Sequence, residues 1–225
     1  MAWFSTGAAA QVEEARDTRL RNAMVDTHLK GRDILDPVVL RAMRDVRRHR
    51  FVPEGKRRSA YEDRPLPIGS GQTISQPYIV AFMTQALGLK GGEKVLEVGT
   101  GSGYQAAVLA RIAGHVYSVE IVPELATRAA AALRSEGIDN VTVRHGDGYR
   151  GWAEHAPFDA IVVTAAPDHV PKPLVDQLKP GARLVIPVGV GHQEILLVTR
   201  SPEGVVQRSL LPVRFVPMTG EAQRR

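Results

Sequence analysis

The second half of the chain alternates short β-branched runs with alanine- and leucine-rich stretches. The runs predict seven strands, at Lys94–Val98, Val116–Glu120, Val141–His145, Ala160–Thr164, Arg183–Val188, Ile195–Thr199 and Leu210–Val216. Helical spacing between the runs predicts helices at Tyr104–Ala113 and Pro123–Glu136, the second stopped by Gly137. Strands that alternate with helices are typical of parallel sheets. We therefore expect an α/β fold with a doubly wound, mostly parallel seven-stranded sheet.

The first part of the chain has a different pattern. A helix is expected at Ala8–Leu20, with Val12, Ala15 and Leu20 on one side, and Asp36-Pro37 opens a second one, with the aspartate as its cap. The stretch 51–77 is rich in proline and glycine without apolar periodicity, and an apolar helix follows at Pro77–Leu87. We expect residues 1–88 to form an N-terminal helical cap on a core of residues 89–220, followed by a tail of residues 221–225.

Composition limits the class of protein. The 225 residues are 44% hydrophobic and 24% charged, enough for one sizeable core. Apolar runs fall well short of the ~20 residues that span a bilayer, and Met1–Arg16 has no basic head before an apolar region. We expect a cytoplasmic protein without a membrane partner. The lack of cysteine excludes disulfides and thiolate sites, and the histidines lack metal-ligand spacing, so no metal is expected.

The net charge of +5 is concentrated in a basic stretch between Arg41 and Arg58. No aromatic residues that could stack on bases are interleaved with these charges, which favours a solvated helix face and no nucleic-acid partner. Recruitment of acidic protein segments is an alternative role for the same residues.

A glycine loop, Gly99-Thr100-Gly101-Ser102-Gly103, joins the first core strand to a helix. Ligands of open α/β sheets bind at this carboxyl end of the strands. A dinucleotide loop needs Gly-x-Gly-x-x-Gly for a pyrophosphate, but Tyr104 stands where the last glycine would be. The loop therefore favours a different nucleotide ligand.

Acidic residues stand at the ends of three successive strands: Glu97 just before the loop, Glu120 as the last residue of the next strand and Asp147 after the third. In that order they suit the ammonium of a methionine group, two ribose hydroxyls and an adenine amine. A strand-ending acid alone is often only a helix cap. Together the three residues and the loop predict S-adenosyl-L-methionine as the cofactor.

Several segments carry a family resemblance: Gly71-Gln72-Thr73-Ile74-Ser75-Gln76-Pro77, Glu97-Val98-Gly99-Thr100-Gly101-Ser102-Gly103-Tyr104, Phe158-Asp159-Ala160-Ile161-Val162-Val163-Thr164-Ala165-Ala166 and Phe215-Val216-Pro217-Met218-Thr219. Over roughly residues 30–219 the chain resembles the protein-L-isoaspartate (D-aspartate) O-methyltransferases. The resemblance implies a Rossmann-like core and methyl transfer to the free α-carboxylate of isoaspartyl residues in damaged proteins and peptides. S-adenosyl-L-homocysteine is the by-product, and the ester closes to a succinimide outside the enzyme. We expect a monomer.

The resemblance also implies site residues. Ser75 matches the active-site serine, while a helix cap before Pro77 is the structural alternative. With the strand-end argument, the expected cofactor site is Gln72, Thr73, Ile74, Ser75, Glu97, Gly99, Thr100, Gly101, Ser102, Glu120, Ile121, Asp147, Gly148 and Thr219. The chain departs from the family pattern at Ser70, where many relatives have a larger polar residue, and at Ala182, where glycine is common.

The chemistry of the acceptor fits this assignment. A carboxylic acid with a pKa near ~4 is already ionised at neutral pH, so the transfer needs alignment rather than a general base. Methylation of a base or amide nitrogen is the nearest alternative, but Thr164-Ala165-Ala166-Pro167 lacks the side-chain amide or carboxylate that such enzymes place after the fourth strand. A non-catalytic binding module of the same fold is the other alternative.

Overall fold

The computed structural model describes the backbone of residues 5–224 and the side chains of residues 11–224. Predictions that concern residues 1–4 of the cap and residue 225 of the tail lie outside the described residues. No helix within this range combines the length and apolar character needed to cross a membrane.

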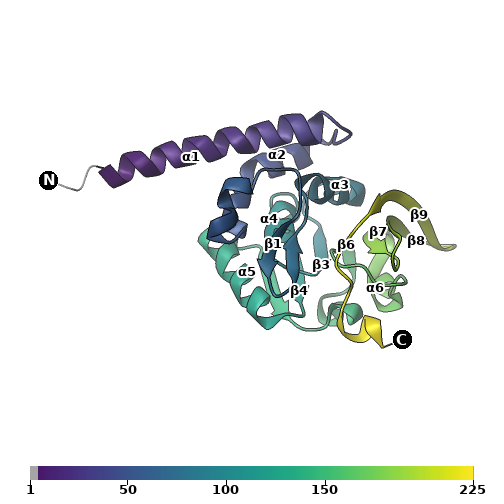
Figure 1. The fold of residues 1–225 in the computed structure, drawn as a ribbon. Helices are drawn as coiled ribbons and strands as arrows, with labels where there is room; N and C mark the ends of the chain where they lie inside the picture. Colours follow the sequence, from purple (N-terminus) through teal and green to yellow (C-terminus); the bar gives the residue numbers. More distant parts are fainter. Residues whose placement is uncertain (1–4, 225) are drawn as a thin grey trace.

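A single large sheet dominates the fold, as Figure 1 shows. Within residues 5–224 it has seven strands, in the order β5-β4-β3-β6-β7-β8-β9. The first five of this order run parallel, and β7, β8 and β9 form an antiparallel meander. Their bounds are β3 Lys94–Val98, β4 His115–Glu120, β5 Val141–His145, β6 Phe158–Val163, β7 Leu178–Val188, β8 Gln193–Ser201 and β9 Gly204–Val213. The prediction of a mostly parallel seven-stranded sheet is confirmed.

The last strand differs most from its prediction. It was expected at Leu210–Val216, whereas β9 spans Gly204–Val213. Its first half, Gly204–Ser209, is exposed, including Val205 and Val206, and it is held by backbone pairing with β8, so no alternation of apolar and polar residues marks it. Residues 214–216 leave the sheet edge because the carbonyl of Val216 accepts from the amide of Ala166, after β6, at 2.9 Å.

Successive side chains along a strand point to opposite faces of the sheet, so the strands contribute to two hydrophobic layers, one on each face. On one face Val95, Val162 and Val185 join buried residues of helices α2 (Pro37–Asp45), α3 (Pro77–Leu87), α4 (Tyr104–Ala110) and α5 (Pro123–Ser135). On the other face Leu96 and Ile161 meet α6 (Lys172–Asp176) and the 3₁₀ turns η4 (Gly148–Arg150) and η6 (Gly220–Gln223). The N-terminal residues therefore share one core with the sheet, and the division at residue 88 stays a prediction.

The cap helices begin where the sequence indicates. Asp36 caps α2, its carboxylate accepting from the amide of Val38 at 2.8 Å, and α3 has the predicted bounds. The helix after the glycine loop ends at Ala110, three residues before its predicted end at Ala113. There the amides of Arg111 and Ile112 bond to carbonyls three residues back, which tightens the last turn.

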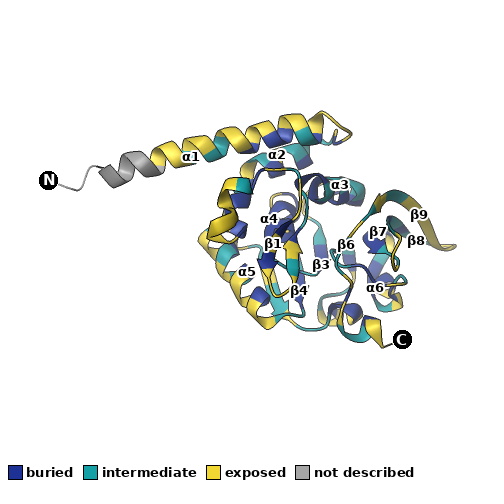
Figure 2. Cartoon of the chain, viewed as in Figure 1, coloured by how far each residue is buried: buried dark blue, intermediate teal, exposed yellow. Residues whose placement is uncertain are grey.

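Helix α1 (Ser5–Met24) continues into a short π-helix, Val25–Lys30, and projects beyond the body of the molecule (Figure 1). The side that was predicted to be apolar is exposed at Val12, Ala15 and Leu20 (Figure 2). Polar residues face the body instead, so the predicted helix forms but its predicted apolar side does not pack.

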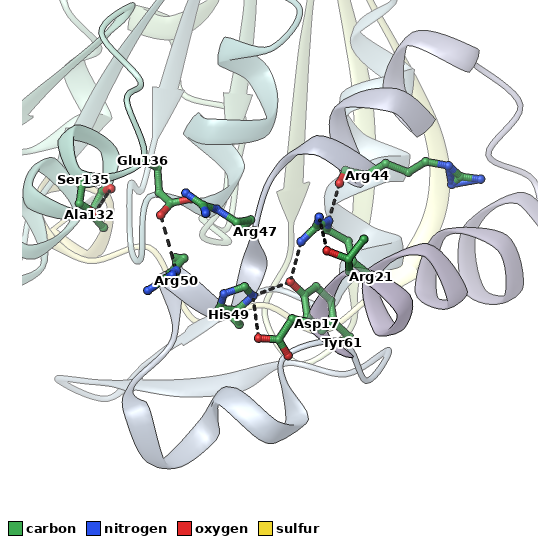
Figure 3. A network of polar contacts seen from close by, with 11 residues as sticks. Asp17, Arg21, Arg44, Arg47, His49, Arg50, Tyr61, Ala132, Ser135 and Glu136 are labelled. Carbon is green, nitrogen blue, oxygen red and sulfur yellow. Dashed lines mark hydrogen bonds and ion pairs between the residues drawn. The ribbon is translucent and has the colours of Figure 1, made fainter. Parts of the chain in front are cut away.

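A polar network attaches α1 to the cap (Figure 3). The hydroxyl of Tyr61 lies 2.7 Å from Nδ1 of the buried His49 and accepts from Arg21 at 3.3 Å, while Asp17 lies 3.6 Å from the same histidine nitrogen. Burial lowers the pKa of His49, which favours its neutral form. Polar contacts therefore hold the middle of α1, while Met24 at its end is buried in the hydrophobic core.

The stretch 51–77 is more ordered than its composition indicates. It begins at the end of the 3₁₀ turn Arg48–Phe51, and it contains the 3₁₀ turn Glu54–Ser59 and a hairpin formed by β1 (Leu66–Gly69) and β2 (Gln72–Ile74). The hairpin turn has a positive φ at three consecutive residues, including 51° at Ser70. Strands of three or four residues are too short to show a period, so the sequence could not reveal them.

Candidate active site

The glycine loop lies where the sequence predicts, between β3 and α4 at the carboxyl end of the parallel strands. Gly99 has φ of 98°, and a Cβ atom there would lie 2.3 Å from Oγ1 of Thr164. That hydroxyl donates to the carbonyl of Gly99 at 2.6 Å. Only glycine allows the loop to approach β6 this closely.

A cavity with an empty volume of about 810 Å³, part of it open to solvent, lies above this loop. Twelve of the predicted cofactor residues line it: Gln72, Thr73, Ile74, Ser75, Gly99, Thr100, Gly101, Ser102, Glu120, Ile121, Gly148 and Thr219. The structure thus brings together residues from β2, the glycine loop, the end of β4 and the C-terminal segment.

Glu120 is the acidic residue of this wall. Its carboxylate accepts from the amide of Gly101 at 2.7 Å and from the amide of Val122 at 2.9 Å. Each oxygen keeps a lone pair after one such bond. The glycine loop therefore fixes a negatively charged acceptor at the end of β4, which fits a pair of sugar hydroxyls.

Glu97 was predicted to bind the ammonium of the methionine group, but it is not part of the cavity wall. It is fully buried beneath the loop and does not line the cavity. Ser118 donates to one of its oxygens and in turn lies 2.5 Å from the hydroxyl of Thr100, which does line the cavity, while Oε1 has no partner among the described residues. Burial raises the pKa of Glu97 to about 8, with a smaller contribution from the charge of Glu120. Glu97 can reach the cavity only through Ser118 and Thr100.

Asp147 does not line the first cavity either. One carboxylate oxygen accepts from the amide of Tyr149 at 2.9 Å, and the other accepts from the amide of Glu221 at 2.7 Å. Its neighbour Gly148 lines the cavity, as does Thr219 from the segment that Asp147 holds. The carboxylate thus joins the turn after β5 to the C-terminal segment.

Ser75 lies between two cavities. The second cavity has an empty volume of about 760 Å³ and shares Thr73, Ser75, Thr164 and Val216 with the first. The capping alternative is not realised, because Gln76 is the N-cap of α3. No described residue forms a hydrogen bond with the Ser75 hydroxyl. This hydroxyl remains available to a bound molecule.

Several lining residues were not in the predicted set. Thr164 and Ala165 follow β6, and Val216, Pro217 and Met218 form a strand-like segment beside Ala166. The strand-end argument that identified Glu120 could have included Thr164, because β6 is the other neighbour of β3. Val216, Pro217 and Met218 follow β9, and their position depends on how the chain leaves the sheet. The other unpredicted lining residues come from α3, β3, α4 and β4: Val80, Val98, Tyr104, Gln105 and Val119. No group of three His, Asp or Glu side chains suited to a metal occurs within the described part of the chain.

Comparison with known proteins agrees with this geometry. The sequence model of the protein-L-isoaspartate(D-aspartate) O-methyltransferase (PCMT) family matches residues 19–223. A protein-L-isoaspartate O-methyltransferase of Gloeobacter violaceus is 58% identical over 200 residues, 88% of this chain and 98% of its own length. One from Opitutus terrae is 59% identical over 216 residues, covering 95% and 92% of the two chains.

Solved structures give the same result. A protein-L-isoaspartate O-methyltransferase superposes with a TM-score of 0.80 at 29% identity, over 92% of this chain and 67% of the other. A Plasmodium falciparum protein named as a beta-aspartate methyltransferase, in complex with S-adenosyl-L-homocysteine, gives a TM-score of 0.78 at 28% identity, over 88% and 98% of the two chains. The chain therefore belongs to the protein-L-isoaspartate(D-aspartate) O-methyltransferase family.

Proposed function

We propose that this chain transfers the methyl group of S-adenosyl-L-methionine to the free α-carboxylate of L-isoaspartyl residues in damaged proteins and peptides. The family match over residues 19–223 supports the reaction and the acceptor class. The position of Ser75 in the wall shared by two cavities is the structural observation that supports the site. In this proposal the first cavity binds the cofactor and the second binds the acceptor.

The residues of the first cavity fit the cofactor. Glu120 would accept from the ribose hydroxyls, the glycine loop would lie against the methionine part, and Gly148 and Thr219 would border the adenine. When bound, S-adenosyl-L-methionine supplies a sulfonium methyl group. Glu97 is buried and has an unpaired oxygen, so we assign it a role through Ser118 and Thr100 rather than direct contact.

Ser75 would orient the acceptor. Its unpaired hydroxyl can donate to one carboxylate oxygen and leave the other to attack the methyl group in line. The carboxylate is ionised at neutral pH, so no residue has to remove a proton. The negative charge of the acceptor and the positive charge of the sulfonium are both lost in the transfer, which a pocket shielded from water favours.

Two further properties belong to the proposal. We place the protein in the cytoplasm, and we expect it to act as a monomer. Sedimentation analysis at several protein concentrations tests the second point, and a mass that doubles with concentration would contradict it.

A pair of peptides tests the reaction. Both have the same composition, and one contains an isoaspartyl linkage where the other contains an aspartyl linkage. With cofactor labelled in the methyl group, we expect base-labile label on the isoaspartyl peptide alone. Equal labelling of both peptides would refute the acceptor assignment. Cofactor binding without labelling of either would favour the non-catalytic binding module.

A further inference from the structure

The second cavity contains one formal charge. All the other lining residues are apolar or uncharged. The full lining is Pro65, Thr73, Ser75, Gln76, Ile79, Thr164, Pro212, Val213, Arg214, Phe215 and Val216. Arg214 is the charged member of this set, and it is exposed to solvent at the point where the chain leaves β9.

Arg214 has no acidic partner. Within the part of the chain that the structure describes, its guanidinium takes part in no hydrogen bond, ion pair or ring contact. Arg150 and Arg200 differ in this respect, since Arg150 pairs with Glu221 and Arg200 donates to two carbonyls, whereas exposed Arg208 on β9 is likewise without a partner among the described residues. The Arg214 charge is therefore not used to stabilise the fold.

The backbone around Arg214 is held firmly in place. The amide of Phe215 donates to the side chain of Gln193 at 2.6 Å, and the carbonyl of Phe215 accepts from the same side chain at 3.3 Å. The carbonyl of Val216 accepts from Ala166. Arg214 thus joins, from a fixed backbone, the lining of a cavity that shares Ser75 with the first cavity.

We propose that Arg214 is the residue that recognises the negative charge of the acceptor, and that it distinguishes the carboxylate substrate from the methyl ester product. This inference rests on the proposed function. A carboxylate that leaves water for an otherwise uncharged cavity needs a counter-charge, and a guanidinium supplies one together with directed donors. After transfer the acceptor is a neutral ester, so the attraction that drew the substrate in no longer retains the product.

Kinetic constants of Arg214→Gln test this role. We expect the KM for an isoaspartyl peptide to rise about 2- to 5-fold, as is typical when an exposed charge pair is lost. The kcat at saturating peptide and the KM for S-adenosyl-L-methionine should stay within about twofold. Arg214→Lys should recover part of the loss. Arg208→Gln is the matched control, because Arg208 is exposed on β9 and lies outside the cavity.

A neutral inhibitor separates charge recognition from general damage to the cavity. The probe is the same peptide with an α-carboxamide in place of the α-carboxylate, used as a competitor. Its inhibition constant should be equal for the original protein and for Arg214→Gln. An unchanged KM in Arg214→Gln, or a parallel rise of the inhibition constant, would overturn the proposal. Lack of isoaspartyl methylation by the unchanged protein would instead refute the function itself.

Discussion

The carboxylate of Asp147 accepts a hydrogen bond from the amide of Glu221, 2.7 Å away and 74 positions later in the chain. The approach is close: a Cβ atom on Gly220 would lie 2.5 Å from the same oxygen. Buried Met218 and Ala222 flank this contact. Asp147 therefore anchors the segment that contributes Pro217, Met218 and Thr219 to the first cavity.

Asp147→Asn should weaken cofactor binding. An amide side chain retains one acceptor oxygen, so either Tyr149 or Glu221 loses its partner, at a cost of about 1 kcal/mol. We expect a higher Kd for S-adenosyl-L-homocysteine by titration calorimetry, with a smaller effect on kcat. Asp139→Asn is the control, because Asp139 is exposed in the turn before β5. An unchanged Kd would mean that the anchor does not shape the cavity.

Ser75→Ala should separate binding from turnover. Loss of the hydroxyl removes a donor to the acceptor but leaves the backbone wall of the first cavity intact. We expect kcat to fall about 10- to 100-fold, since misalignment of reacting groups has effects of this size. Cofactor affinity should be retained. If the affinity falls and kcat does not, Ser75 serves the cofactor instead. Ser135→Ala, on the exposed end of α5, is the control.

Glu97→Gln should change how stability depends on pH. Burial raises the pKa of folded Glu97 from 4.5 to about 8, so between these values the unfolded chain is ionised and the folded chain is not. The contribution of this group is complete below pH 4.5 and is lost as pH rises towards 8. Glutamine cannot ionise, so the variant should lose less stability over this window.

Urea unfolding of the cofactor-free protein at a series of pH values measures this difference. The midpoint of Glu97→Gln should approach or exceed that of the original protein as pH rises. Parallel curves for both proteins would show that Glu97 is ionised when folded. Glu203→Gln, at the exposed tip of the β8–β9 hairpin, should leave the pH dependence unchanged.

Ser70→Asn should stabilise the protein. Ser70 has a φ of 51° in the β1–β2 turn, the one positive value at a non-glycine residue in the described chain. This region costs most residues about 1–2 kcal/mol, whereas asparagine tolerates it, so we expect a gain of about 0.5 kcal/mol in unfolding free energy. Ser70→Ala keeps the unfavourable conformation and should give no gain. Thermal unfolding of both variants measures the effect, and an equal response would exclude strain at this residue.

Most strands of the sheet could be predicted because each is marked by the residue types within its own short segment. Strands β3 and β5 have their predicted bounds, since each is a short segment with several β-branched residues that is followed by a glycine. The hairpin β1–β2 and the first half of β9 were missed because they are held by backbone pairing between short or polar segments. Hydrophobic periodicity carries no signal for such pairing.

The site, too, could be predicted only in part from the sequence. Glu120 and the glycine loop border the cavity because strand ends of a parallel sheet meet at one edge. The positions of Glu97 and Asp147 could not be deduced in this way. Both lie close to the end of a strand. The side chain of Glu97 accepts from Ser118 beneath the loop, and that of Asp147 accepts from the amide of Glu221. A pattern of residue types does not specify which of two nearby partners a carboxylate contacts.

The projection of α1 away from the body has a practical consequence for handling the protein (Figure 1). An affinity tag or a surface linker attached ahead of this helix would be held clear of both cavities. The same addition after η6 would sit beside Thr219 and the anchor at Asp147. Immobilised forms for screening should therefore be attached through their amino-terminal side.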